Sequence, residues 1–374
     1  MAVQIKEVVS KKDVKEFIYL PEKIHKDHPN WVYPLYVDEK QYYNPKKNKS
    51  FSHCDTKLLL ALKDNKVVGR IMGIINNKYN ESHQEHNARF FNLECYNDLE
   101  VAGALLTNIE QWARKKGMKK LVGPLGFSDK DPQGFLLEGF DQPMVIATNC
   151  SFPYMIDLME QLKYDKEIDH VVYKLEVPKV IPELYRKVYE RTIERNHFSL
   201  QEFETRKELK PFIKPIFELI NETYANIYGF SEIEKAEMDY MANRYLPVID
   251  PHFVKIVSNS DGEIVGFIIG MPDIAEGIRL AKGRLFPFGL LKIISSSKKT
   301  KLINLLLGAI KDEYRNNGFD AVMGVKMLES AIKSGHEIID SHLMLENNVK
   351  MRAEFEKMGG VVYKKYRIFS KQLS

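Results

Sequence analysis

The chain has 374 residues, of which 44% are apolar and 28% are charged. This composition excludes an intrinsically disordered chain, and the length predicts two domains rather than one. The net charge is +4, from 55 basic and 51 acidic residues, and this small, dispersed surplus argues against a nucleic-acid-binding protein.

The N-terminal stretch MAVQIKEVVSKKDVKEF lacks the apolar core of a signal peptide. No run of about 18 apolar residues predicts a membrane-spanning helix. The three cysteines, Cys54, Cys95 and Cys150, are widely separated and lack metal-ligand spacing, which is typical of buried thiols in a reducing compartment. We therefore expect a cytoplasmic protein without a metal site.

Two halves of the chain repeat one order of elements, namely hairpin, helix, strand, helix and strand. The two hairpins are predicted at residues 57–77 and 252–270. The stretches 100–116 and 319–334 carry apolar residues on one helical face, and they predict helices that end at Gly117 and Gly335. This repeat predicts an α/β (α+β) fold of two tandem domains, each with a mixed, mostly antiparallel sheet flanked by helices.

We place the domain boundary after residue 176, so that the predicted domains are residues 1–176 and 177–374. The second half carries an extra stretch, GIRLAKGRLFPFGLLKIISSSKKT, in which apolar and basic blocks alternate. Such a pattern is typical of an interfacial segment or of a loop and helix packed on a core. Of the two, the core interpretation is favoured.

An anion-binding turn is predicted in the second half, between the strand INLLLGAI and the helix at 319–334. Its residues are Arg315, Asn316, Asn317, Gly318, Phe319 and Asp320. Arg315 supplies positive charge, and Gly318 allows the backbone to approach a ligand closely. The matching point of the first half has three carboxylates and no basic residue, and Asn97 with Glu100 predicts a capping box there. We therefore expect the first half to lack this site.

This turn resembles the acyl-CoA loop of the GNAT superfamily, which runs Gln or Arg, two residues, Gly, one residue, then Gly or Ala. Asp320 stands at the last of these positions. The stretch LENNVKMRAEFEKMGG resembles the end of a GNAT domain, and the resemblance implies that Asn348 contacts the pantetheine arm. Phe355 stands where many GNAT enzymes have a proton-donating Tyr, so Tyr363 or Tyr366 is the candidate substitute, with a structural role in the strand as the favoured alternative for both.

Further phrases, among them VVGRIMGIIN, FFNLECYNDLEVAGALL and GRLFPFGLLK, resemble bacterial double-domain GNAT-like proteins of the uncharacterised N-acetyltransferase type. The resemblance spans about residues 57–370. It implies an acyl-CoA-dependent N-acyltransferase that uses acetyl-CoA or another acyl-CoA, bound by the second half. The chain departs from the family at 274–276 and at His342, where the family more usually has Asn and Trp.

Glu346 lies at the end of the predicted strand EIIDSHLML, where the sheet of a GNAT domain splays, and it is the candidate general base, with a solvent-facing carboxylate or a helix cap as the alternative. Asp340 and His342 are secondary candidates for this role, and they are expected on one face of the same strand because they are two residues apart. Polar substrate contacts are expected from Asp273, Arg284 and His342, with Tyr224, Asn226 and Tyr228 beside the acceptor.

The expected acceptor is a small-molecule or lipid amine, and relatives of this type suggest long-chain sphingoid bases as one class. The replacements Asp320 and Phe355 keep a second function open, that of a non-catalytic ligand-binding or scaffold protein. A peptidoglycan aminoacyltransferase would also use twin domains, but it would carry a coiled-coil arm, and no heptad run is visible. Homodimer formation is left open.

Overall fold

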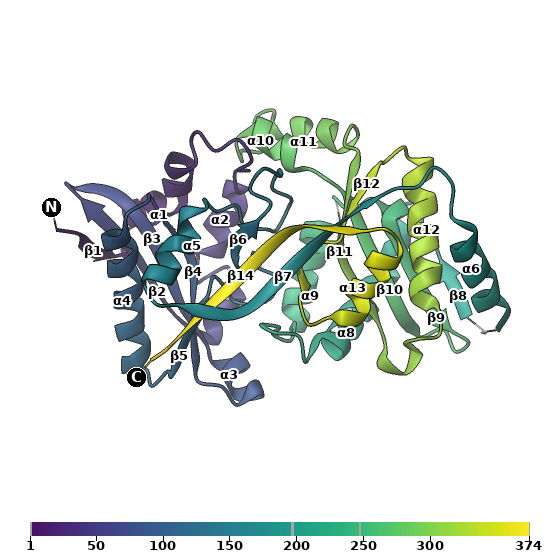
Figure 1. The fold of residues 1–374 in the computed structure, drawn as a ribbon, viewed down its shortest axis with the longest axis horizontal. Helices are drawn as coiled ribbons and strands as arrows, with labels where there is room; N and C mark the ends of the chain where they lie inside the picture. The colour runs from purple at the N-terminus through teal and green to yellow at the C-terminus, as the bar shows by residue number, and fades with distance from the viewer. Residues whose placement is uncertain (1, 196–197, 247, 374) are drawn as a thin grey trace.

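The computed structural model describes residues 2–195, 198–246 and 248–373, which fold around one continuous sheet (Figure 1). The elements of the first half are β1 (Gln4–Glu7), α1 (Lys11–Ile24), α2 (Tyr36–Tyr42), η1 (Lys49–Ser52), β2 (Cys54–Lys63), β3 (Lys66–Asn76), α3 (Asn77–His83), β4 (Asn87–Cys95), α4 (Leu99–Lys115), β5 (Lys120–Gly123), β6 (Phe135–Glu138), α5 (Tyr154–Gln161) and β7 (Asp165–Glu176).

The second half repeats this order and adds a helical hairpin before its fourth strand. Its elements are α6 (Glu183–Arg195), β8 (Phe198–Gln201), α7 (Arg206–Leu209), η2 (Lys210–Phe212), α8 (Ile213–Tyr224), α9 (Lys235–Tyr245), η3 (Pro251–Phe253), β9 (Val254–Asn259), β10 (Ile264–Pro272), α10 (Ala275–Ala281), α11 (Gly289–Ser297), β11 (Leu302–Ile310), η4 (Asp312–Tyr314), α12 (Phe319–Lys333), β12 (Ile338–Asp340), β13 (Met344–Leu345), α13 (Val349–Lys357) and β14 (Val361–Gln372).

The predicted hairpins and helix ends are confirmed. β2 with β3 and β9 with β10 are antiparallel pairs at the expected places. Gly117 and Gly335 follow α4 and α12 with φ of 78° and 72°. Glycine adopts this left-handed conformation without the steric penalty that a Cβ atom would cause, so it commonly ends a helix.

The last strand of each half is exchanged with the other half. The strand order is β1-β2-β3-β4-β5-β14-β7-β12-β11-β10-β9-β8, so β14 pairs with β5 of the first half and β7 pairs with β12 of the second. The two exchanged strands also pair with each other, and Figure 1 shows them crossing at the middle of the molecule. The boundary after residue 176 stays a prediction. The part of the sheet that belongs to each half is completed by a strand from the other half.

The exchange places C-terminal side chains in the core of the first half. Phe369 of β14 is 1% exposed and packs in one cluster with Phe90 and Phe135. Conversely, Leu175 of β7 lies in the core of the second half beside Ile303. Each core is therefore closed by the other half of the chain, and we expect the two halves to unfold together.

We expect Phe369→Ala to lower the free energy of unfolding by about 3–5 kcal/mol, because it leaves a cavity in a closely packed core. Hydrogen exchange should also accelerate at β4 and β5, far away in sequence. Val361→Ala, at the 60% exposed end of the same strand, is the matched control and should change the stability little. Faster exchange confined to the second half would contradict the shared core.

The strand predicted at EIIDSHLML is interrupted. β12 ends at Asp340 and β13 begins at Met344, and between them His342 has φ of 57°. Asp340 and His342 therefore do not share one face of a continuous strand, and the prediction that they do is wrong. A non-glycine residue rarely adopts this conformation, and apolar alternation alone does not reveal it.

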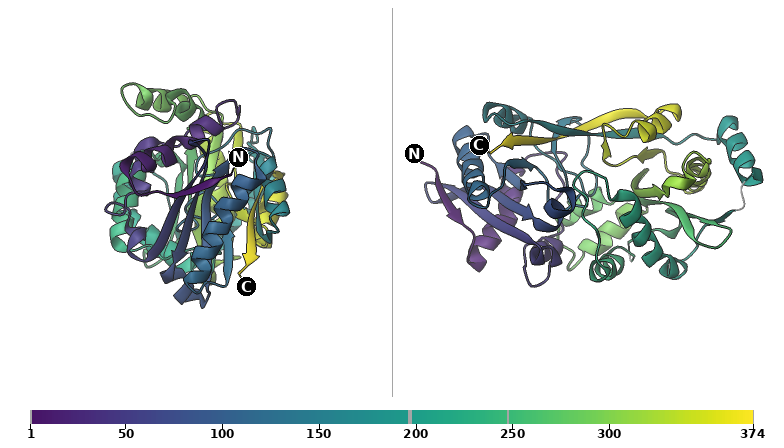
Figure 2. Two further views of the ribbon diagram at one scale, coloured as in Figure 1. Left: turned by 90° about the vertical axis from the view of Figure 1, so that its left-hand side faces the viewer. Right: turned by 90° about the horizontal axis from the view of Figure 1, so that it is seen from below.

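The core interpretation of the extra stretch is confirmed for its inner side only, where Ile278 and Ile293 pack in a buried cluster with Met271. Residues 275–297 form the α10–α11 hairpin, which stands at the edge of the molecule in Figure 1 and projects beyond the sheet in the left view of Figure 2. Phe286 and Phe288 are 84% and 66% exposed. Among the described residues, no helix is both long and apolar enough to traverse a lipid bilayer.

Candidate active site

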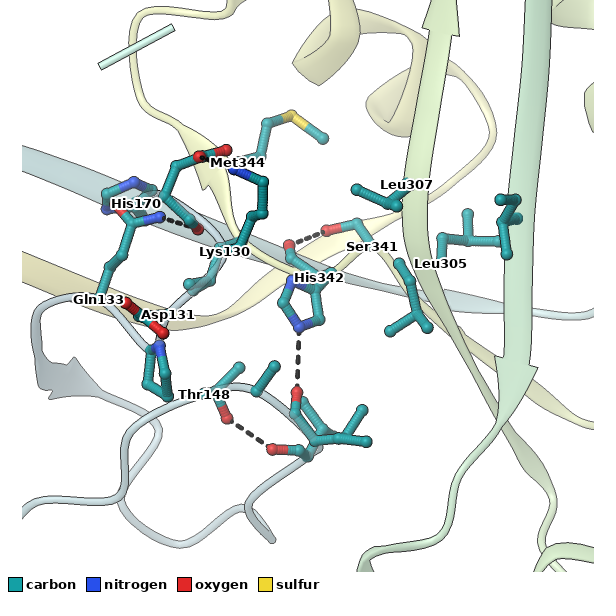
Figure 3. Close-up of a pocket in the computed structure, with 18 of the residues that line it drawn as sticks. Lys130, Asp131, Gln133, Thr148, His170, Leu305, Leu307, Ser341, His342 and Met344 are labelled. Carbon is teal, nitrogen blue, oxygen red and sulfur yellow. Dashed lines mark hydrogen bonds and ion pairs between the residues drawn. The ribbon is translucent and has the colours of Figure 1, made fainter. Parts of the chain in front are cut away.

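A cavity of about 2030 Å³ runs from the gap between α12 and α13 into the space between the two halves. At the helical end its lining includes Arg315, Asn316, Asp320, Gly324, Met351 and Lys357. Between the halves its lining includes Lys130, Thr148, His170, Leu305, Leu307 and His342 (Figure 3). Drug-sized pockets measure about 300–1,000 Å³, so this cavity can hold a much larger ligand.

The sheet opens where the two ends of the cavity meet. β11 and β12 are parallel neighbours only over Leu302–Asn304 and Ile338–Asp340. Beyond this point β11 continues along β10 to Ile310, whereas the chain after β12 turns away and pairs with β7 as β13. The edge of β11 is therefore uncovered by β12 from Leu305 onward, and an extended ligand can lie along it.

The backbone of the turn before α12 has two residues in the left-handed conformation, which allows its amide groups to contact a ligand. Asn316 and Gly318 have φ of 65° and 85°, and Gly318 is the N-cap of α12. Among the described residues, no side chain caps this helix, so the amides of its first turn face the cavity mouth without a side-chain acceptor. A helix N-terminus of this kind attracts phosphate oxygens.

The residues predicted for this turn are only partly brought together. Arg315, Asn316 and Asp320 line the cavity, and Arg315 is held by Asp312 at 2.8 Å and by the carbonyl of Ile310 at 3.3 Å. Asn317 is exposed, and the Phe319 ring is buried against Phe198, so Phe319 can meet a ligand only through its backbone.

The corresponding helix of the first half is closed to anions. Asp98 is the N-cap of α4, and its carboxylate accepts hydrogen bonds from the amides of Glu100 and Val101 at 3.1 and 3.2 Å. Lys63 binds the same carboxylate at 2.6 Å. The predicted Asn97 cap is wrong by one residue. The N-terminus of α4 is thus already neutralised by a carboxylate of the protein.

Asn348 and Glu346 are both engaged within the protein. Asn348 is the N-cap of α13, where its side chain accepts a hydrogen bond from the amide of Met351 at 3.4 Å, although it also lines the cavity. Glu346 does not line the cavity. Its carboxylate lies 2.8 Å from Lys166 and accepts the amide of Asp169 at 3.0 Å, which directs it to β7 of the first half.

Tyr363 lies behind the cavity wall. Its hydroxyl donates to Asp340, and burial together with that carboxylate raises the pKa of Tyr363 well above its ordinary value. The other oxygen of Asp340 accepts the backbone amide of His342 at 2.6 Å. The pair therefore fixes the backbone at His342 and offers no proton to the cavity.

Asp273 and Arg284 make contacts at the α10–α11 hairpin and do not line the cavity. Asp273 accepts the amide of Ala275 at 3.1 Å and the side chain of Asn304 at 2.9 Å. Arg284 lies on the surface, 3.2 Å from Glu22 of the first half. Neither side chain reaches the cavity.

The residues expected beside the acceptor, Tyr224, Asn226 and Tyr228, all line the cavity. The Tyr224 hydroxyl donates to the carbonyl of Gly308 at 2.9 Å and is 3.4 Å from its amide. The Tyr224 hydroxyl thus contacts both the backbone carbonyl and the backbone amide of Gly308 on β11. A ligand that adds to β11 at this point competes with Tyr224.

The imidazole of His342 lies in the opening between β11 and the loop that follows β6 (Figure 3). Its Nε2 is 3.0 Å from the carbonyl oxygen of Ile146, so Nε2 carries a proton and donates it. In the neutral ring, Nδ1 therefore holds the lone pair. An imidazole placed in this way is able to accept a proton from a bound substrate.

His170, a residue that sequence reasoning missed, is the second imidazole of the cavity. It lies on β7 and is 3% exposed, and its Nδ1 has no partner among the described residues. Burial lowers the pKa of His170 to about 4, and His342 adds to this effect, whereas Asp169 and Glu346 oppose it. The ring is therefore neutral at physiological pH. One His in the strand IDHVVYKLEV carries no spacing signal that could have predicted this.

The lowered pKa of His170 predicts how the free energy of unfolding changes at acidic pH. The folded protein holds this ring neutral down to a pH of about 4, whereas the unfolded chain binds its proton near 6.5. Stability should therefore fall as the pH drops from 6.5 to 4, by up to about 3 kcal/mol from this group alone. Denaturant titrations of His170→Gln should show a flatter dependence over this range.

The control for this measurement is His252→Gln. The hydrogen bond to Asp250 raises the pKa of the exposed His252, so His252 loses its stabilising contribution as the pH rises instead. Its replacement should not flatten the acid limb. An unchanged acid limb in His170→Gln would show that the ring can be protonated in the folded state without cost.

Comparisons with known proteins agree with this geometry. No family model matches the chain. It is 27% identical over 368 residues to the bacterial ceramide synthase of Caulobacter vibrioides, covering 96% of this chain and 95% of that protein. It is 26% identical over 384 aligned residues to protein YghO of Escherichia coli, covering 99% and 95%.

Two solved structures resemble the whole chain. A tandem GNAT protein from the clavulanic acid biosynthesis pathway matches with a TM-score of 0.55 and 11% identity, covering 100% of this chain and 99% of that one. A GCN5-related N-acetyltransferase from Sphaerobacter thermophilus matches with a TM-score of 0.53 and 12% identity, covering 99% and 96%. At this identity the likeness establishes the fold.

Proposed function

Because the chain has the tandem GNAT fold, we propose that it is an acyl-CoA-dependent N-acyltransferase whose second half binds the acyl-CoA. The observation that carries this proposal is the continuity of the cavity. It connects the uncapped N-terminus of α12 with the open edge of β11 and with the space between the halves, which the imidazole of His342 lines. A pyrophosphate, a pantetheine arm and a thioester would follow one another along such a path.

In the proposed reaction, the amine attacks the thioester carbon, a C–N bond forms and the C–S bond breaks. His342 Nδ1 accepts the proton that the amine loses, and the departing thiolate takes up a proton from solvent. His170 keeps the neighbouring wall uncharged because it is neutral. Most of the rate enhancement would come from holding amine and thioester together in a cavity shielded from water.

We further propose that the amine is carried on a long apolar chain. The cavity is about twice the size of an ordinary pocket for a small ligand, and apolar side chains such as Leu305, Leu307 and Met344 line its central part. The 27% identical relative is named a bacterial ceramide synthase, which agrees with a long-chain amine as acceptor.

A second candidate function, a non-catalytic ligand-binding protein, is favoured by two observations. The carboxylate of Asp320 lies at the cavity mouth, where it would repel a pyrophosphate. Phe355 is 6% exposed and stacks on Tyr173, so it supplies no proton at the position where many GNAT enzymes have Tyr.

The test is to measure binding of acetyl-CoA and palmitoyl-CoA by calorimetry, then acylation of sphinganine and of small amines by mass spectrometry. We expect palmitoyl-CoA to bind more tightly and sphinganine to be acylated. Binding without transfer to any amine would favour the non-catalytic alternative. Failure to bind either thioester would contradict both the acyl-CoA site and the acyltransferase function.

A further inference from the structure

The α10–α11 hairpin is inserted between β10 and β11 and stands outside the sheet (Figures 1 and 2). Its two helices pack closely, since a Cβ atom at Gly277 would lie only 2.6 Å from the Cα of Ile293. Its tip contacts the first half, because the carbonyl of Gly283 in the hairpin accepts a hydrogen bond from the amide of Tyr36 in the first half at 3.0 Å. The hairpin is thus a defined element held at the junction of the two halves.

The outer side of this hairpin is apolar and unpartnered. Of the large apolar side chains that are exposed among the described residues, more than a third lie within this one short stretch. They are Leu280, Phe286, Phe288, Leu290, Leu291 and Ile294, and we call this set the apolar face. Single exposed apolar residues are ordinary, but a cluster of this kind marks a surface that is covered in function.

The charge of the hairpin is mainly positive, and Glu276 in the first turn of α10 is its one carboxylate. Between Gly277 and Thr300 the chain has six basic residues and no carboxylate. These residues are Arg279, Lys282, Arg284, Lys292, Lys298 and Lys299. Two of them have acidic partners, Glu276 for Arg279 and Glu22 for Arg284. An apolar surface flanked mainly by cations is complementary to an anionic lipid bilayer, which offers both acyl chains and negative headgroups.

The opposite side of the same hairpin lines the active-site cavity. Ile278, Leu285 and Ile293 contribute to its wall, and Leu290 is both 45% exposed and part of that wall. The apolar face and the cavity are therefore separated by little more than the hairpin itself. A chain that leaves a bilayer at this surface has a short, apolar route to the interior.

We propose that the α10–α11 hairpin docks on an anionic membrane surface and admits the long-chain amine from the bilayer into the cavity. The admission step rests on the proposed function, whereas the docking step does not. The apolar face enters the headgroup region, and the surrounding cations contact the phosphates. Each basic residue close to such a surface strengthens binding by about fivefold at low ionic strength.

The test uses the full chain and flotation with vesicles of phosphatidylcholine, with or without phosphatidylglycerol. We expect binding to the anionic vesicles that weakens with added salt. Phe288→Ser/Leu291→Ser should weaken it by about tenfold or more, because two exposed apolar side chains no longer enter the bilayer. The matched control is Val180→Ser/Leu184→Ser, at positions 69% and 68% exposed before and within the first turn of α6, and it should bind as the wild type does.

Equal loss in both double variants, or no binding of the wild type, would overturn the proposal and leave a protein partner as the occupant of the apolar face. A second readout separates docking from catalysis. Acylation of an amine embedded in vesicles should fall in Phe288→Ser/Leu291→Ser, while acylation of the same amine in detergent micelles should not. Intact vesicle binding without acylation in either medium would contradict the proposed function and leave the docking surface standing.

Discussion

Replacing Gly318 with alanine is expected to weaken acyl-CoA binding by about 30-fold or more, without unfolding the protein. Gly318 has φ of 85°, and an added Cβ would lie 2.3 Å from the Thr192 hydroxyl oxygen of α6. Real Cβ atoms essentially never lie that close, so either the Thr192 side chain or the turn before α12 must shift. Binding would have to restore a displaced turn, at a cost of about 2 kcal/mol.

The matched control is Gly262→Ala. Gly262 has φ of 83° in the turn between β9 and β10, and a Cβ atom added there would have no neighbour within 4 Å. It carries the same backbone strain without a clash, so it should lose a little stability and bind acyl-CoA normally. Adding Thr192→Ala to Gly318→Ala should recover part of the affinity. Unchanged binding by Gly318→Ala in calorimetry would contradict a phosphate cradle at this turn.

The helices and hairpins were predictable from the sequence because each is determined by residues that are close together along the chain. Apolar residues on one helical face, followed by Gly117 or Gly335, predict where α4 and α12 end, and the turns at 63–66 and 259–263 predict the hairpins. The tandem GNAT fold is confirmed for the same reason, since the order of elements repeats along the chain. None of these features depends on which distant strand pairs with which.

The strand exchange was not predictable in this way. β7 and β14 follow equivalent helices, and either would complete the sheet of its own half equally well by pattern. Similarly, Glu346 stands at the expected end of a strand, but its partner is Lys166, on a strand supplied by the other half. The site was expected within the second half alone, whereas the cavity also draws His170 and Thr148 from the first.

These differences share one physical cause. A strand pattern reports which residues face a core, but not the partner strand or the rare backbone conformations. The left-handed conformation at His342 interrupts the strand and creates the opening beside β11. The apolar composition of the α10–α11 hairpin does not show which of its side chains pack on the protein, as Ile278 and Ile293 do, and which stay exposed, as Phe286 and Phe288 do.

Replacing His342 with glycine is expected to lower kcat by about 100- to 10,000-fold, the usual contribution of a positioned general base. Glycine suits this position because φ is 57°, so the backbone should lose no stability through strain. Affinity for acyl-CoA should change little, because the imidazole lines the part of the cavity between the two halves, whereas Arg315 lines the part beside α12. The fall should therefore appear in kcat and not in thioester binding.

Two further measurements separate proton transfer from packing. Added imidazole should restore part of the activity of His342→Gly, because it can enter the space that the side chain leaves. His342→Gln can still donate to the carbonyl of Ile146 but has no basic nitrogen, so it should be as inactive as the glycine variant and gain nothing from imidazole. If His342→Gln keeps most of the wild-type kcat, His342 only positions the loop after β6, and solvent removes the proton of the amine. Rescue confined to His342→Gly would instead show that the opening between β11 and β12 is where the proton is transferred.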